Sequence, residues 1–171
     1  MNHLKRVILC HDRYPTREHY PFSLPLLQQT NAIELRNPIS VFVGENGTGK
    51  STVLEAIARR CGIHIWREPE RRRAVRNPYE GQLPRYMDIE WADGAVPGSF
   101  FASEVFRHFA ELFDEFASLD PGQLEPFGGR SLVTQSHGES FMAFFASRYR
   151  IKGLTCWTSR RPPSRRDSSW S

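Results

Sequence analysis

Eight consecutive residues, Gly44-Glu45-Asn46-Gly47-Thr48-Gly49-Lys50-Ser51, fit the pattern G-x-x-x-x-G-K-[ST] of a phosphate-binding loop. Glycines let the backbone wrap a polyphosphate with its N–H groups turned inward, and a helix that begins at the loop adds free amides and a favourable dipole. In such a loop Lys50 reaches the β- and γ-phosphates, and Ser51 ligates Mg²⁺. With Thr52, which follows directly, this stretch predicts binding of a nucleoside triphosphate, ATP, together with its magnesium ion.

The residues on both sides of the loop predict the elements that hold it. Residues 39–43 form a short apolar run after Pro38, the pattern of a strand buried on both faces. Beyond the loop a helix is predicted to end at Gly62. Its apolar residues recur at helical spacing: Val53, Leu54, Ile57, Ala58 and Cys61. The alternative is a chance glycine-rich turn, but the matching strand and helix on the two flanks favour the phosphate-binding interpretation.

Composition indicates one ordinary globular domain. The chain has 171 residues, 39% of them hydrophobic and 25% charged. No apolar run approaches a membrane span and the N-terminus lacks an apolar signal region, so the expected location is cytoplasmic, with no membrane partner. Cys10, Cys61 and Cys156 have no metal-ligand spacing and are interpreted as reduced thiols. The net charge of +4 comes largely from arginines after Thr155, so it gives little support to nucleic-acid binding.

Apolar patterns predict further strands at residues 4–10, 32–35 and 87–91, with a proline-punctuated loop over residues 11–25. Gly98 and Ser99 are expected to lead into an amphipathic helix that ends at Asp120. One face of that helix is predicted to be core rather than a cofactor site: Val105, Phe109, Leu112, Phe113 and Phe116. Residues 68–79 are polar, and their Arg71, Arg72, Arg73 and Arg76 are interpreted as a solvated loop in preference to a contact for a base, DNA or a partner.

A second motif, residues 135–140, precedes an apolar helix that carries Phe141, Phe144 and Phe145. Ser136 and Glu139 have the spacing of a capping box, in which each side chain satisfies a backbone N–H at the start of a helix. Hydrolase chemistry by a serine beside His137 is a weak alternative, because adjacent side chains do not form a triad.

Both motifs resemble those of a known ATPase class. The Asn46-Gly47 pair is similar to the G-x-N-G-x-G-K-[ST] loop of ABC-type ATPases and of the related chromosome-maintenance and DNA-repair heads. Gln135-Ser136-His137-Gly138-Glu139 looks like the ABC signature L-S-G-G-Q/E, with Ser136, Gly138 and Glu139 in register and His137 in place of a glycine. The chain thus resembles predicted bacterial AAA/ABC-type P-loop ATPases.

The resemblance implies an α/β P-loop NTPase fold of the ABC-head type, with a mixed sheet and flanking helices. It implies ATP and Mg²⁺ as cofactors, and a head-to-tail homodimer in which the signature residues Ser136, His137, Gly138 and Glu139 contact the γ-phosphate held by the opposite subunit. It also implies a Q-loop residue, for which Glu104 lies in the right neighbourhood. Nucleic acid enters as a partner by analogy alone.

The catalytic carboxylates of that class are missing from the expected place. A Walker B strand ending in Asp-Glu should follow the signature helix, but residues 154–165 are rich in Arg, Pro and Ser. Those residues suggest no central strand. One permitted coding, with a single T inserted after the codon of Leu154, instead reads Leu-Tyr-Leu-Leu-Asp-Glu-Pro-Glu-Ala-Ala-Leu-Ser. The hypothesis is therefore a frameshift that truncates the ATPase before Walker B; the alternative is a genuine basic tail.

These interpretations divide the chain into a partial ATPase domain, residues 1–154, and a disordered basic tail, residues 155–171, that leaves the sheet incomplete at the C-terminus. The expected function is ATP binding and hydrolysis by a nucleotide-driven dimerising switch, in DNA repair or phage defence, with weak ATP binding and poor hydrolysis by this chain. Two alternatives stay open: a P-loop small-molecule kinase with the arginine-rich loop as its lid, and a non-catalytic nucleotide-binding fragment.

Overall fold

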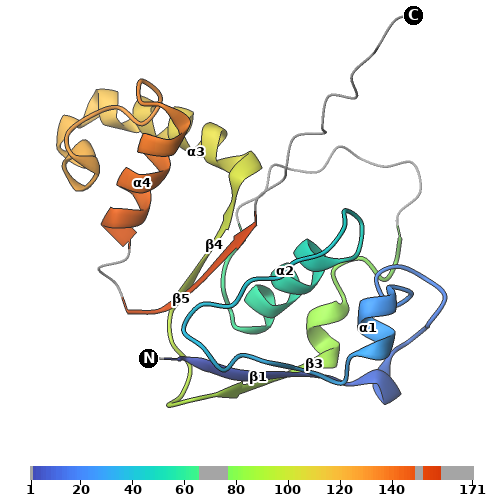
Figure 1. The fold of residues 1–171 in the computed structure, drawn as a ribbon. Helices are drawn as coiled ribbons and strands as arrows, with labels where there is room; N and C mark the ends of the chain where they lie inside the picture. The colour runs from blue at the N-terminus through green and yellow to red at the C-terminus, as the bar shows by residue number, and fades with distance from the viewer. Residues whose placement is uncertain (1, 66–76, 149–151, 159–171) are drawn as a thin grey trace, which may run out of the picture.

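The computed structural model describes residues 2–65, 77–148 and 152–158. A three-stranded antiparallel sheet lies at one end of the molecule (Figure 1). Its central strand β1 (Leu4–Leu9) pairs with β2 (Ala32–Glu34) and β3 (Met87–Trp91). Strand β1 buries Leu4, Val7 and Leu9: Val7 and Leu9 alternate along the strand, and the register with β3 shifts between Leu4 and Arg6. These three strands confirm the prediction from apolar patterning.

Helix α2 (Lys50–Arg60) packs against this sheet and ends as its sequence predicts. Gly62 adopts a φ of 75° at the helix end, where its N–H donates to the Arg59 carbonyl at 3.1 Å. The next N–H, that of Ile63, donates to the Ala58 carbonyl at 2.9 Å, which completes a Schellman motif. Val53, Ala56 and Ile57 are buried against β1, β3 and the short helices η2 (Leu83–Tyr86) and α1 (Pro25–Gln29).

A second sheet of two parallel strands lies beside the first. Strand β4 (Gly98–Ala102) pairs with β5 (Leu154–Thr158), and Phe100 lies opposite Cys156. Both side chains are buried with Ala58 of α2, so α2 contacts the cores of both sheets. A Cβ on Gly98 would collide with the Leu154 carbonyl and the Ile63 side chain, so this close pairing requires glycine.

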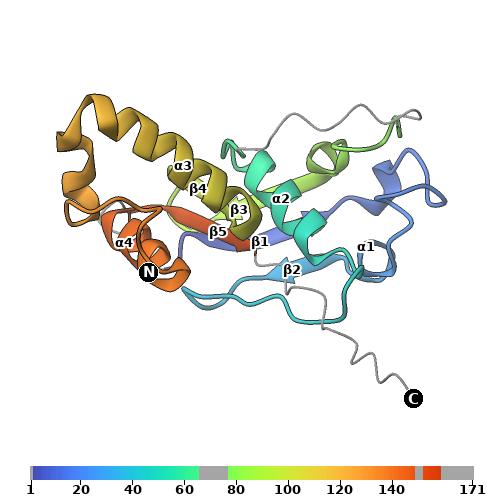
Figure 2. The same ribbon diagram turned by 90° about the horizontal axis from the view of Figure 1, so that it is seen from above.

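Helices α3 (Ser103–Leu119) and α4 (His137–Arg148) cover the other face of β4 and β5 (Figures 1 and 2). They are joined through the short helix η3 (Pro121–Phe127). The three helices close around a core of six buried residues: Phe106, Ala110, Phe127, Leu132, Phe141 and Phe144. Asp120 ends α3, and its carboxylate accepts a hydrogen bond from the Gly122 N–H at 3.2 Å, as the Asp-Pro-Gly sequence predicts.

Several predictions of elements need correction. Residues 98–102 are a strand rather than the approach to a helix, because their backbone pairs with β5. The buried face of α3 carries Phe106, Ala110 and Ala117. Of the predicted core residues, Phe109 and Phe113 pack against this core, whereas Leu112 and Phe116 are 38% and 56% exposed. The side chain of Val105 lies outside what the structure describes. The core of α3 lies under β4 and α4, and helical spacing alone does not fix which side of an aromatic-rich helix faces that core.

The predicted tail is also corrected over its first residues. Residues 155–158 belong to β5, where Cys156 is buried and Trp157 packs on Phe141 and Phe145, with ring centroids 6.1 and 5.6 Å apart. A five-residue strand needs only alternate apolar side chains and a partner, and β4 supplies the partner. Residues 159–171, and the arginines at positions 71, 72, 73 and 76, lie outside the described residues.

Within the described residues, no helix has the length and apolar character that crossing a membrane requires.

Candidate functional site

The loop before α2 has the backbone of an anion cradle. Gly44, Gly47 and Gly49 have φ values of 147°, 83° and 92°, a region that side chains other than glycine rarely adopt. Gly49 is also the N-cap of α2, and its carbonyl accepts the first helical hydrogen bond, from the Val53 N–H at 2.9 Å. Left-handed glycines followed at once by a helix N-terminus give the concavity of backbone amides that binds phosphate in proteins.

Lys50 lies folded over this loop. Its Nζ donates to the Gly44 carbonyl at 2.8 Å, to the Glu45 carbonyl and to the Thr48 Oγ1 at 3.2 Å. The Thr48 hydroxyl in turn donates to the Glu45 carbonyl at 2.9 Å. The ammonium of Lys50 is therefore hydrogen-bonded to uncharged oxygens of its own loop. The charged oxygens of a phosphate would be stronger acceptors for the same N–H donors.

The remaining predicted residues line the same loop and the first turn of α2. Asn46 and Ser51 are exposed, and Thr52 is half-buried. Thr52 Oγ1 lies 2.8 Å from the Tyr20 hydroxyl. No group of three or more His, Cys, Asp or Glu side chains able to hold a metal exists in the part of the chain that the structure describes. The loop fits Mg²⁺ through Ser51, because Mg²⁺ in nucleotide sites takes few protein ligands beside phosphate oxygens and water.

The segment before the loop differs from the prediction. Residues 39–43 are not a strand, and the side chains of Ile39, Val41 and Val43 are 81%, 77% and 84% exposed. Only the alternate residue Phe42 packs on the core. The prediction of a strand buried on both faces is therefore wrong here: the run has strand periodicity, but neither β1–β3 nor β4–β5 pairs with it.

The second motif forms a capping box at the N-terminus of α4. The Ser136 N–H and hydroxyl donate to Glu139 Oε2 at 3.0 and 2.5 Å, and the Glu139 N–H lies 3.4 Å from Ser136 Oγ. These hydrogen bonds, first from the Ser136 side chain and then from its backbone, hold the pKa of the Glu139 carboxyl below its ordinary value. The prediction of a capping box is thus confirmed. The role of the same residues as a signature that contacts nucleotide stays a prediction.

Two further features bear on the second motif. An added Cβ on Gly138 would meet nothing within 4 Å, so the fold of a single chain does not require glycine there. Figures 1 and 2 place α4 on one flank of the molecule and the start of α2, beside α1, on the other. Within one chain the structure does not bring Ser136 to the phosphate-binding loop. The side chains of His137 and Glu104 lie outside what the structure describes.

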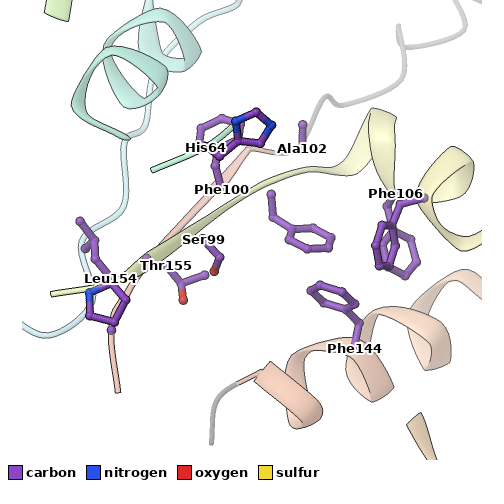
Figure 3. Close-up of a pocket in the computed structure, with 13 residues that line it drawn as sticks. His64, Ser99, Phe100, Ala102, Phe106, Phe144, Leu154 and Thr155 are labelled. Carbon is purple, nitrogen blue, oxygen red and sulfur yellow. The ribbon is translucent and has the colours of Figure 1, made fainter. Parts of the chain in front are cut away.

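A cavity of about 360 Å³ lies where β4 faces α3 and α4 (Figure 3). Its lining includes the aromatic residues Phe106, Phe109 and Phe144, together with His64 and Ser99. Figure 3 shows the rings of Phe106 and Phe144 close together on the side of the helices and Ser99 on β4. Sequence reasoning missed this cavity, because it missed β4. The only signal that could have revealed it was the run Gly98-Ser99-Phe100-Phe101-Ala102, a short apolar stretch next to Leu154 in the fold.

Comparison with known proteins agrees with the loop geometry. Residues 22–66 match the model of a family described as an AAA domain. The match spans about a quarter of the chain, from the segment that contacts the loop to the end of α2. No curated protein and no solved structure matched the chain. The match supports a nucleotide-binding P-loop of the AAA ATPase type over these residues.

Proposed function

We propose that this chain binds Mg-ATP through residues Gly44 to Thr52. The observation that carries the proposal is the Lys50 ammonium, held at 2.8 Å on the Gly44 carbonyl above a loop of left-handed glycines. When ATP binds, Lys50 exchanges these carbonyls for β- and γ-phosphate oxygens, the loop amides hold the phosphate chain, and Ser51 ligates the magnesium ion. Glu45, Asn46 and Thr48 shape the rim of the loop.

Lys50→Ala is expected to weaken Mg-ATP binding about 10- to 100-fold, because it removes charge-assisted hydrogen bonds. Isothermal titration calorimetry with Mg-ATP measures this. Lys152→Ala, an exposed lysine outside the loop, is the matched control and should bind as the unchanged chain does. Equal affinity of the Lys50→Ala and unchanged chains would contradict the proposal.

The proposal extends to a dimeric switch. Two heads pack head-to-tail, and Ser136, His137, Gly138 and Glu139 of one subunit face the γ-phosphate held by Lys50 and Ser51 of the other. Two observations support this arrangement: α4, whose N-terminus Ser136 caps, lies on the flank of the molecule opposite the start of α2, and Gly138 leaves open space at the start of α4. By resemblance, closure on ATP and opening after hydrolysis would drive a process in DNA repair or phage defence.

Hydrolysis by this chain is proposed to be slow, because residues 154–165 lack the Walker B Asp-Glu pair. The proposed cause is a frameshift after Leu154. The position of β5 supports it: β5 is parallel to β4 and ends at Thr158, the position where the shifted frame places an aspartate. Functional side chains of α/β sheets gather at the carboxyl ends of parallel strands.

A variant that carries the shifted frame from residue 155 onward is expected to hydrolyse ATP about 100-fold faster or more, since it regains the carboxylate that activates water. Release of phosphate measures the rate. The matched control is the same variant with glutamine in place of the glutamate that the shifted frame supplies directly after that aspartate. If the unchanged chain hydrolyses ATP as fast as the frame-shifted variant, the frameshift proposal is wrong, while the ATP-binding proposal stands. Sequencing of the locus tests the reading frame directly.

A further inference from the structure

The second sheet carries two hydroxyl side chains on a face that is otherwise aromatic. Strands β4 and β5 are parallel, with Ser99 opposite Thr155 and Phe101 opposite Trp157. Because residues two apart in a strand point to the same side, these four side chains share one face. The Phe101 ring packs on Phe144 of α4 with centroids 4.3 Å apart, whereas the much shorter Ser99 and Thr155 line the cavity of about 360 Å³. Figure 3 shows both of them on the side of the sheet on which Phe144 lies.

The interior of this cavity is an aromatic wall. Five of the 13 lining residues are phenylalanine, and Phe106 and Phe144 among them are buried. The centroid of the Phe101 ring lies 5.6 Å from that of Phe106, and the Phe109 ring lies 5.3 Å from that of Phe144. Rings that pack on one another hold their positions. A planar ligand therefore meets faces and edges that are already arranged, and little side-chain entropy is lost when it binds.

The mouth of the cavity is polar. Ser99 is half-buried there, and Thr155 and His64 are exposed. A hydroxyl group both donates and accepts hydrogen bonds, so Ser99 and Thr155 can pair with a polar group on a ligand whose apolar part lies deeper. An apolar interior with a few polar groups is the usual composition of a small-molecule site.

The size of the cavity limits the ligand. Small-molecule sites in proteins have volumes of about 300 to 1,000 Å³, and an apolar cavity of about 150 Å³ already holds benzene. At about 360 Å³, the cavity beside β4 has room for two fused aromatic rings and little more. Nucleotides and other large polar ligands do not fit this volume and lining.

We infer that this cavity is a second binding site, which takes a small planar aromatic molecule that carries one hydroxyl or amino group. The rings of the ligand lie against Phe106, Phe109 and Phe144, and its polar group bonds to the hydroxyls of Ser99 and Thr155. None of the residues of the phosphate-binding loop lines the cavity, so the inference does not depend on binding of Mg-ATP.

The test uses two probes, 2-naphthol and naphthalene, which share the fused rings and differ in one hydroxyl group. Equilibrium dialysis against the full chain gives a dissociation constant for each. A double variant, Ser99→Ala with Thr155→Val, removes both hydroxyls of the cavity with little change of shape. It is expected to weaken binding of 2-naphthol about three- to tenfold, the contribution of a hydrogen bond, and to leave naphthalene within about twofold.

A second variant tests the location of the probes. Ser99→Leu places a larger side chain in the cavity and is expected to weaken both probes about tenfold or more. Ser118→Leu makes the same substitution at an exposed position of α3 and is the matched control, which should bind both probes as the unchanged chain does. Circular dichroism of each variant verifies that a loss of binding does not come from unfolding.

Three results would overturn the inference. The first is an unchanged chain that binds neither probe up to the solubility limit of each. The second is a folded Ser99→Leu chain with undiminished affinity, because the probes would then bind elsewhere. The third is a double variant that weakens both probes equally or neither, because the hydroxyls of Ser99 and Thr155 would then not select the polar group of the ligand.

Discussion

At the residue scale, the most informative positions are those whose geometry is determined by their nearest neighbours in sequence. The three left-handed glycines and Lys50 form the loop with contacts that span no more than six residues. Ser136 and Glu139 form their capping box over three residues. Local features of this kind depend on residue type and spacing alone, which explains why the sequence predicted the helix that starts after the loop and the capping-box alternative for the second motif, but not the absence of a strand before the loop.

The capping box leads to a prediction about stability. Ser136→Ala removes the N-cap of α4 and is expected to lower the free energy of unfolding by about 1 kcal/mol, measured by urea denaturation at neutral pH. Ser147→Ala, near the C-terminal end of the same helix, should cost less, because its hydroxyl donates to the carbonyl of Phe144 within the helix and caps no N–H.

The same box has a pH dependence whose sign follows from Glu139. Its pKa in the folded chain is lowered from 4.5 by the Ser136 hydrogen bonds. A lowered pKa contributes stability above pH 4.5, and that contribution is lost as the pH falls through the folded pKa. The destabilisation caused by Ser136→Ala is therefore expected to be larger at about pH 6 than at about pH 3, because the stabilisation of ionised Glu139 by Ser136 is lost in acid. An equal destabilisation at the two pH values would contradict this role of the capping box.

At the element scale, the wrong predictions from sequence concern short apolar segments. Residues 39–43, 98–102 and 154–158 all have five residues and strand-like composition, yet only the second and third form a ladder. A strand is stable only with a neighbour, and the neighbour is contributed from elsewhere in the chain. Helices α2, α3 and α4 were predicted because their bonds are internal, although the buried side of α3 again depended on distant residues.

Because the apolar side chains of residues 39–43 are largely exposed, we expect a charged substitution there to have little effect on stability. Val41→Lys is expected to change the free energy of unfolding by less than about 0.5 kcal/mol and to raise solubility, because Val41 is 77% exposed. Val7→Ala, at the fully buried centre of β1, should cost about 2 kcal/mol and is the comparison. Equilibrium denaturation of both variants measures this; a large cost for Val41→Lys would mean that residues 39–43 are buried after all.

At the scale of the whole molecule, helix α2 contributes side chains to the cores of both sheets. Its residues Val53, Ala56 and Ile57 enter the core of the antiparallel sheet, and Ala58 enters the core of β4 and β5. Arg60 adds a hydrogen bond from its Nε to the Met87 carbonyl at 2.6 Å. Since α2 starts at the phosphate-binding loop, a ligand there is attached to a helix that contacts both sheets. Relations of this kind, like the position of Tyr20 beside Thr52, join distant residues and were not predictable from spacing.

The burial of Cys156 in β5 has a practical consequence. Burial raises the pKa of its thiol to about 12, and burial likewise raises the pKa of Cys61 to about 11. At neutral pH the Cys156 side chain is therefore almost entirely the protonated thiol, and alkylating reagents attack the thiolate. Iodoacetamide will therefore modify Cys156 almost solely in chains in which β4 and β5 have separated. The rate of this modification then reports how often the second sheet opens.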